Sequence, residues 1–204
     1  MKLRNVGKIV TVALLASTSS LAKTTTRSEG TSPWAPELLQ WYSCGEQLAA
    51  GYPLSESQVK TALHTVADAS VDSTPEFLSL TTAIIAAESA FNNNAVSAGG
   101  AVGYMQLTLI GAKEAGKVCP FLHSGGVSDL ALALKIRHPA ENVKHGTCLL
   151  KYYLSQVDNN LLHALVLYNG GYVQLTRLVN TGTLTEETSK YVLRVHSYLG
   201  RCSK

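Results

Sequence analysis

One glutamate, Glu88, stands at the end of an apolar segment that carries no other charge. Thr74 followed by Pro75 is a typical helix start, and on the helix predicted from there Glu88 shares a face with Ile84 and Ile85. A carboxyl group on such a core-facing stripe is desolvated, so it keeps its proton near neutral pH, as a general acid must. The alternative is a glutamate that is exposed to solvent at the end of its helix.

A glycine-rich loop follows this glutamate and ends in Gly103-Tyr104-Met105-Gln106. Residues 100 and 103 of this loop are glycines, which permit backbone conformations and close approaches that a Cβ would obstruct. Strand signals are nearly absent elsewhere, and a short hairpin is predicted only within this loop, at 98–105.

The segments around the loop show helical patterns. Pro36 begins a helix that runs towards Gly51, and Ser55-Glu56-Ser57-Gln58 is a capping box before an apolar stripe. Further helices are predicted at 75–90, 107–116, 128–137, 140–157, 160–169 and 185–199. We therefore expect a mostly α-helical fold with a single domain.

The first 22 residues have the pattern of a signal peptide, with three basic residues, an apolar stretch and cleavage expected after Ala22. We expect 23–33 to be a flexible lead-in and 34–71 to be helices that pack on the domain. No later segment has transmembrane length, so an exported, soluble protein without an anchor is expected. The net charge of +3 comes from the three basic residues of the signal peptide, which argues against a nucleic-acid partner.

Four cysteines follow the signal peptide, and an even number in an exported chain indicates two disulfides with three possible pairings. We expect Cys44 to pair with Cys202, which would tie the first helix to the end of the last. Cys119 would then pair with Cys148 and fix the loop after the glycine-rich motif. His145 and Cys148 have a ligand-like spacing, but no second pair accompanies them, so no metal site and no cofactor are predicted.

Five short motifs occur in order along the chain. They are Glu88-Ser89, Ser97-x-x-Gly100-Ala101-x-Gly103-Tyr104-Met105-Gln106, Asn142-Val143-x-x-Gly146, Ala164-Leu165-x-x-Tyr168-Asn169-x-Gly171 and Glu187-Thr188-x-x-Tyr191-Val192-x-x-Val195. Together they resemble the soluble lytic transglycosylase domain, glycoside hydrolase family 23, over about 72–198. The chain departs from the family's usual pattern at Tyr104, where leucine is common, at Leu149, often an aromatic residue, and at 109–112, usually Pro-x-Thr-Ala.

The resemblance implies a lysozyme-like helical domain, here 72–204, that cleaves the β-1,4 bond between N-acetylmuramic acid and N-acetylglucosamine and leaves a 1,6-anhydromuramoyl end. Glu88 would be the single acid and base, and Tyr168 would orient it. The substrate would contact a larger set of side chains, namely Ser89, Gly103, Tyr104, Met105, Gln106, Asn169 and Tyr191. Ordinary glycosidases need two carboxylates. No other acidic residue occurs between Phe77 and Glu114, although Asp129 or Glu141 could fold into the cleft.

Two other function classes stay open on the same scaffold. One is a hydrolase that resembles goose-type lysozyme, and the other is a catalytically silent protein that binds peptidoglycan. The expected partner is the glycan strand of peptidoglycan. The protein is expected to be a monomer and to be located in the periplasm or outside the cell. Wall turnover, toxicity and opening the wall for an envelope-spanning secretion or conjugation machine would all use such a domain.

Overall fold

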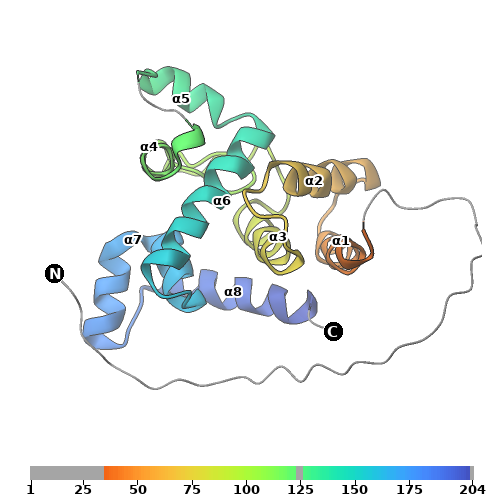
Figure 1. Cartoon of the computed structure of the whole chain (residues 1–204). Coiled ribbons are helices and arrows are strands. Elements are labelled where there is room, and N and C mark those ends of the chain that lie inside the picture. The colour runs from red at the N-terminus through yellow and green to blue at the C-terminus, as the bar shows by residue number, and fades with distance from the viewer. Residues whose placement is uncertain (1–34, 123–125, 203–204) are drawn as a thin grey trace, which may run out of the picture. The chain divides into compact units, whose positions relative to one another are not determined.

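The computed structural model describes residues 35–122 and 126–202, so the predicted signal peptide and lead-in lie outside the described part. The described residues are mostly helical, as the sequence predicts (Figure 1). The helices are α1 (Pro36–Ala49), α2 (Glu56–Ala69), α3 (Pro75–Ser89), α4 (Leu109–Val118), the 3₁₀ turn η1 (Pro120–Leu122), α5 (Asp129–Lys135), α6 (Pro139–Gln156), α7 (Leu161–Thr181) and α8 (Glu186–Cys202).

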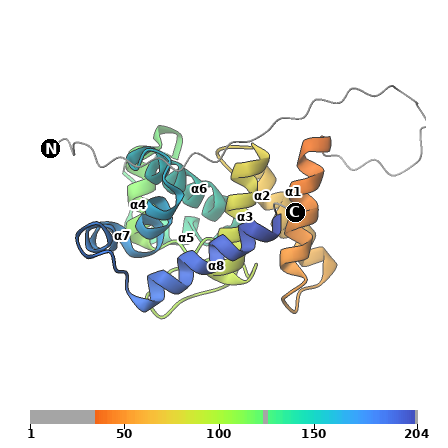
Figure 2. The ribbon, with the colours of Figure 1, turned by 90° about the horizontal axis from the view of Figure 1, so that it is seen from below.

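Helix α3, which carries Glu88, is the centre of one group of helices. It packs against α1, α2 and α8, and α8 runs along α3 and ends beside α1 (Figures 1 and 2). Nearly every side chain of α3 from Phe77 to Ala87 is buried, including those on the side away from Ile84. A helix that is apolar all round is buried by its neighbours. The sequence predicted one buried face, the one with Ile84 and Ile85, but the helix is buried on nearly all sides.

A second core lies among α4, α5, α6 and α7. The loop between α3 and α4 contributes to both cores, because Tyr104 and Met105 pack in the first, whereas Val102 and Leu107 pack in the second. Since the loop spans the junction of the two cores, it is held on both sides. Pairing within it is limited to the bridges Val96–Val102 and Val102–Leu107, so the predicted hairpin is reduced to these contacts.

The end of α3 has an uncommon backbone. Ala90 and Phe91 follow the helix with φ of 52° and 60°, in the left-handed region that residues other than glycine seldom occupy. Phe91 is nevertheless almost fully buried, and this packing holds the turn. The chain therefore leaves the helix immediately after Glu88 and Ser89, which places the glutamate at the rim of the core.

One helix differs from its predicted bounds by more than a few residues. The Gly170-Gly171 pair predicts a helix end, and helix was expected at 160–169, but α7 continues to Thr181. Gly171, with φ of 65° and ψ of −171°, interrupts the helical geometry, so α7 is two helical pieces joined by a kink. The glycine signal was correct locally, but it marks a bend and the chain resumes a helix after it.

Two disulfides join Cys44 to Cys202 and Cys119 to Cys148, the two pairs expected from the sequence. The first connects α1 to the end of α8, and the second connects the residue after α4 to α6. Within 35–122 and 126–202, none of the helices combines the length and apolar character required to cross a bilayer.

Candidate active site

A cleft of about 400 Å³ opens beside Glu88. Its walls come from α3, the glycine-rich loop, α4, α6, α7 and α8, so it lies where the two cores meet. Polar and aromatic side chains line it, among them Glu88, Ser97, Gln106, Glu114, Tyr153, Tyr168, Asn169 and Glu187. The cleft thus contains residues of four of the five motifs, the third being absent from its lining.

The environment of Glu88 favours its protonated form. Burial raises the pKa of Glu88 from 4.5 to about 7, against the opposing effects of the Tyr191 hydroxyl and the Arg194 guanidinium. The carboxylate of Glu187 adds a smaller effect that also raises this pKa. With a pKa near 7, roughly half of the Glu88 side chains carry a proton at neutral pH, so the group can both donate and accept one.

Two tyrosines lie close to Glu88, and they differ in what their hydroxyl groups do. The Tyr168 hydroxyl donates a hydrogen bond of 3.0 Å to the backbone oxygen of Met105. Burial and, secondarily, the charge of Glu88 raise the pKa of Tyr168, so its ring lies within electrostatic range of the carboxyl group. The buried Tyr191 hydroxyl faces the Glu88 carboxyl group without meeting full hydrogen-bond geometry, and it lowers the pKa of Glu88.

The third motif explains how the loop is held. Asn142 is fully buried; its Oδ1 accepts a hydrogen bond from the Met105 N–H (2.8 Å), and its Nδ2 donates to the oxygens of Val102 (2.8 Å) and Ile136 (2.9 Å). A Cβ on Gly103 would lie 2.5 Å from Asn142 Nδ2, and Gly103 has a φ of 76°. Gly103 is therefore required by the packing of the protein, whereas we had expected a close approach to substrate.

The structure brings only part of the predicted substrate-contacting set to the cleft. Gln106 and Asn169 line it, and Gln106 Nε2 also donates to the backbone oxygens of Gly103 (3.0 Å) and Ala95 (3.3 Å). Met105 is fully buried, with its sulfur near Gly146, so in this conformation it has no surface for the apolar substrate contact that was expected.

Ser89 and Tyr104 face elsewhere. Both line a separate cavity of about 510 Å³ between the α1–α2 connection and the turn at 90–94. The Ser89 hydroxyl donates to the Ile85 oxygen (3.1 Å) within α3. Their predicted contacts with the substrate in the Glu88 cleft are therefore not supported by their positions.

Two carboxylates that sequence reasoning did not place in the site also line the cleft. They are Glu187, at the start of α8, and Glu114 on α4, whose Oε2 accepts a hydrogen bond of 2.8 Å from the Tyr153 hydroxyl. The carboxylates considered from the sequence lie outside this lining; Asp129 pairs with Lys113 (2.7 Å) and Glu141 with Lys135 (3.4 Å). Glu187 belongs to the fifth motif, and this is the sequence feature that could have predicted its place in the cleft.

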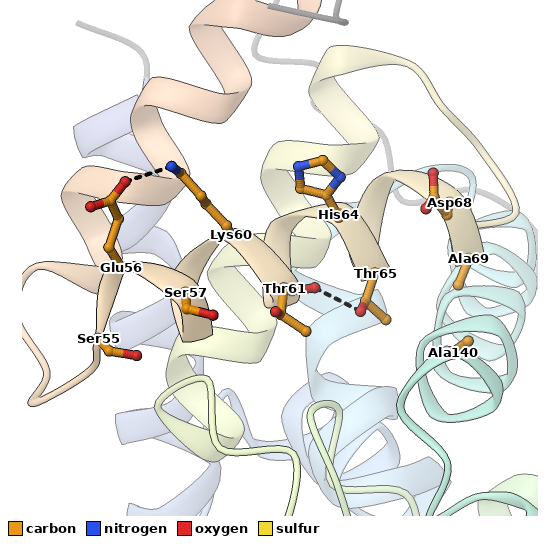
Figure 3. Close-up of a pocket in the computed structure, with 10 residues that line it drawn as sticks. All are labelled: Ser55, Glu56, Ser57, Lys60, Thr61, His64, Thr65, Asp68, Ala69 and Ala140. Carbon is orange, nitrogen blue, oxygen red and sulfur yellow. Dashed lines mark hydrogen bonds and ion pairs between the residues drawn. The ribbon is translucent and has the colours of Figure 1, made fainter.

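A wider groove of about 840 Å³ runs along α2 (Figure 3). Most of its lining residues are of polar types, and they include an exposed ion pair between Glu56 and Lys60 (2.5 Å) and a hydrogen bond from the Thr65 hydroxyl to the Thr61 oxygen (2.7 Å). It shares no residue with the Glu88 cleft and contains none of the motif residues. Size alone therefore does not identify the site, and the smaller cleft is the better candidate.

The ligand-like spacing of His145 and Cys148 has another explanation in the structure. Cys148, which has a ligand-like spacing with His145, is bonded to Cys119. Across residues 35–122 and 126–202, no three histidine, cysteine, aspartate or glutamate side chains gather as a metal-binding group would require.

The sequence pattern of the family described as the transglycosylase SLT domain matches residues 75–189, just over half of the chain, from the start of α3 into α8. The chain belongs to this family. This SLT domain is also similar in structure to the 70 kDa soluble lytic transglycosylase of Escherichia coli, with a TM-score of 0.56 and 24% sequence identity. The match covers 80% of this chain and 28% of the E. coli chain, so the two share the lysozyme-like helical fold over a minor part of the larger protein.

Proposed function

We propose that this protein is a peptidoglycan lytic transglycosylase that cleaves the bond between N-acetylmuramic acid and N-acetylglucosamine without water and leaves 1,6-anhydromuramoyl ends. The observation that supports this most is the position of Glu88. Glu88 lies within the stretch that matches the family, and it is a largely buried carboxyl group, with a pKa of about 7, at a cleft between two cores.

Glu88 would act twice in the reaction. In its protonated form it donates to the glycosidic oxygen, so that the bond to C1 of the muramic acid breaks and a positive charge develops there. The acetamido group of the substrate itself stabilises this charge. Glu88, now a carboxylate, takes the proton from the C6 hydroxyl while O6 bonds to C1, and the carboxyl group returns to its starting form. A pKa near neutral pH suits both steps.

The residues around Glu88 support this sequence of events. Tyr191 faces the carboxyl group, and its hydroxyl favours the charged form that exists between the two proton transfers. Tyr168 is fixed to Met105, so it would position the loop and the sugar and would not bond to Glu88 in the resting state. Asn169 and Gln106 line the cleft with amide groups that match the acetamido groups of the substrate.

A hydrolase is the second candidate, and the placement of Glu187 and Glu114 favours it. An inverting glycosidase uses a second carboxylate to activate water, and both of these side chains line the Glu88 cleft. Glu114 is engaged by Tyr153, which leaves Glu187 as the better candidate for a base.

Digestion of purified sacculi in water enriched in ¹⁸O separates these two functions. The transglycosylase is expected to release anhydro-ended muropeptides without the label. Reducing ends that carry ¹⁸O would assign the protein to the hydrolases. A Glu187→Gln variant is the matched control, because it removes the second carboxylate and leaves Glu88 in place. It should still form anhydro products if the proposal is correct.

The compartment follows from the substrate and the disulfides. Peptidoglycan lies outside the cytoplasm, and disulfides such as Cys44–Cys202 and Cys119–Cys148 persist in oxidising compartments. We therefore propose a periplasmic or secreted location, with 34–71 as an N-terminal part that supports the SLT domain.

A further inference from the structure

The last turn of α3 is held by groups from outside that helix. The last four carbonyl groups of a helix have no partner within it, and in α3 these belong to Ala86, Ala87, Glu88 and Ser89. The Ala86 oxygen accepts a hydrogen bond from the Tyr52 hydroxyl (3.0 Å), and the Ala87 oxygen accepts one from Arg194 Nη1 (3.0 Å). The two carbonyls immediately before Glu88 are thus both bonded to side chains that are distant in sequence.

Tyr52 lies in the connection between α1 and α2 and makes three contacts at this point. Its hydroxyl bonds to Ala86 and also lies 2.7 Å from the Tyr198 hydroxyl of α8. Its ring packs edge-on against Phe91, with the ring centroids 6.0 Å apart. Phe91 is one of the two residues in the left-handed turn that ends α3. Tyr52 therefore contacts the chain on both sides of Glu88.

Arg194 reaches the same turn from α8. Besides its bond to Ala87, its positive charge lowers the pKa of Glu88. The other groups that act on this carboxyl group are Tyr191 and Glu187 of α8, while Tyr168 of α7 is affected by it in return. A cation at the C-terminal end of a helix also interacts favourably with the partial negative charge of its free carbonyls.

These contacts come from parts of the chain that lie beyond the family match. The match ends at 189, before Arg194 and Tyr198, and begins at 75, after Tyr52. The Cys44–Cys202 disulfide joins α1, the helix that precedes Tyr52, to the end of α8, the helix that carries Arg194 and Tyr198. We propose that Tyr52 and Arg194 are positioning residues, which fix the last turn of α3 and so aim the Glu88 carboxyl group into the cleft. This proposal rests on the proposed function, in which Glu88 is the acid and base.

Tyr52→Phe tests the hydroxyl group, because the ring and its contact with Phe91 remain. We expect the variant to fold and to lose at least about tenfold in kcat, with KM changed by less than about twofold, since a misaimed acid affects the transition state more than binding. Tyr198→Phe is the matched control, because it removes the other hydroxyl of the pair and leaves the bond from Tyr52 to Ala86. Its kcat should stay within about threefold of wild type. A Tyr52→Phe enzyme with unchanged kcat, or a Tyr198→Phe enzyme that loses as much, would overturn the proposal for Tyr52.

Arg194→Met tests the guanidinium group with a measurement that does not need activity. The pKa of Glu88, followed by ¹³C NMR of the carboxyl carbon, should rise by at least ~0.5 unit, a threefold change in the protonation equilibrium. Arg194→Lys keeps the charge, so the pKa of Glu88 in that variant should stay close to its wild-type value. Arg137→Met removes an exposed charge before α6 and should not move this pKa. An unchanged pKa in Arg194→Met, or an equal rise in Arg137→Met, would refute the role of Arg194. If wild-type protein released no product from sacculi, the proposed function would fail, but this titration would still test the contact.

Discussion

Replacement of Glu88 by glutamine is expected to remove activity and, at the same time, to make the fold more stable above pH 6. The reason is that burial penalises the carboxylate, while a neutral amide of the same shape carries no such penalty. The pKa of Glu88 is raised from 4.5 to about 7 in the folded protein. Between these two pH values the folded state therefore binds a proton that the unfolded state has released.

The sign and size of the effect follow from that difference. Because the folded state binds more protons, the contribution of Glu88 to the stability of the wild type falls as the pH rises from about 4.5 to 7 and is constant above that range. A shift of about 2.5 units corresponds to roughly 3 kcal/mol at 1.36 kcal/mol per unit, and this is an upper bound for a group that is partly solvated. The Glu88→Gln variant does not lose stability in this way. The difference between its free energy of unfolding and that of the wild type should therefore grow from near zero at pH 4 to about 2–3 kcal/mol at pH 8.

Urea unfolding at pH 4, 6 and 8, with both disulfides intact, measures this advantage. The comparison of variant with wild type at each pH cancels the contributions of other titrating groups, such as Asp72, whose pKa is lowered to about 2 by Lys151 and the Thr74 N–H. The rate at which the same samples release soluble products from sacculi should fall by roughly 10²–10⁴. A stability difference that is independent of pH, or a variant less stable at pH 8, would refute the argument that Glu88 is buried at a cost.

Three further predictions concern the site and its support. The kcat/KM of the wild type should decline above a midpoint near pH 7 as Glu88 of the free enzyme loses its proton, and a pH–rate profile should show this decline. Gly103→Ala should lower the free energy of unfolding by about 2 kcal/mol or more, because the added Cβ would clash with Asn142. Gly100 has a φ of 80° but open space around it, so Gly100→Ala should lower the same quantity by only about 1 kcal/mol in the same unfolding experiment. Asn142→Ala should lower stability by about 2–4 kcal/mol, because the Met105 N–H and the Ile136 oxygen lose the bonds that Asn142 makes with them, while the Val102 oxygen keeps its bond from the Leu107 N–H (3.0 Å). Hydrogen exchange at Met105 should accelerate.

Much of the fold could be predicted from the sequence, because the helices begin with strong local signals. The capping box of Ser55 and Gln58 forms as expected, and Pro75 begins α3. The second half of α7 could not be predicted, since Gly170 and Gly171 carry the same local signal whether a helix ends or bends there. Tertiary packing decides between these outcomes, and a local pattern does not contain it.

Within the site, the sequence singled out Glu88, Gln106 and Asn169, and all three line the same cleft. It did not distinguish residues that hold the loop from residues that face the cleft. Met105 belongs to the second motif, yet its side chain is buried, because the loop spans two cores and one side of it must pack. Similarly, Glu114 gave no sequence signal, since its place in the cleft depends on how α4 lies against α6.

The Cys44–Cys202 disulfide makes the domain a covalent ring. The Cα atoms of the two cysteines lie 5.0 Å apart although 158 positions separate them in the sequence. A protease that cuts a surface loop anywhere between them produces two pieces that stay attached, and the nicked ring still has α1 and α8 on either side of the helix that carries Glu88. In the proposed location outside the cytoplasm, where proteases would meet the protein, a first cut therefore separates no part of the candidate active site from the rest.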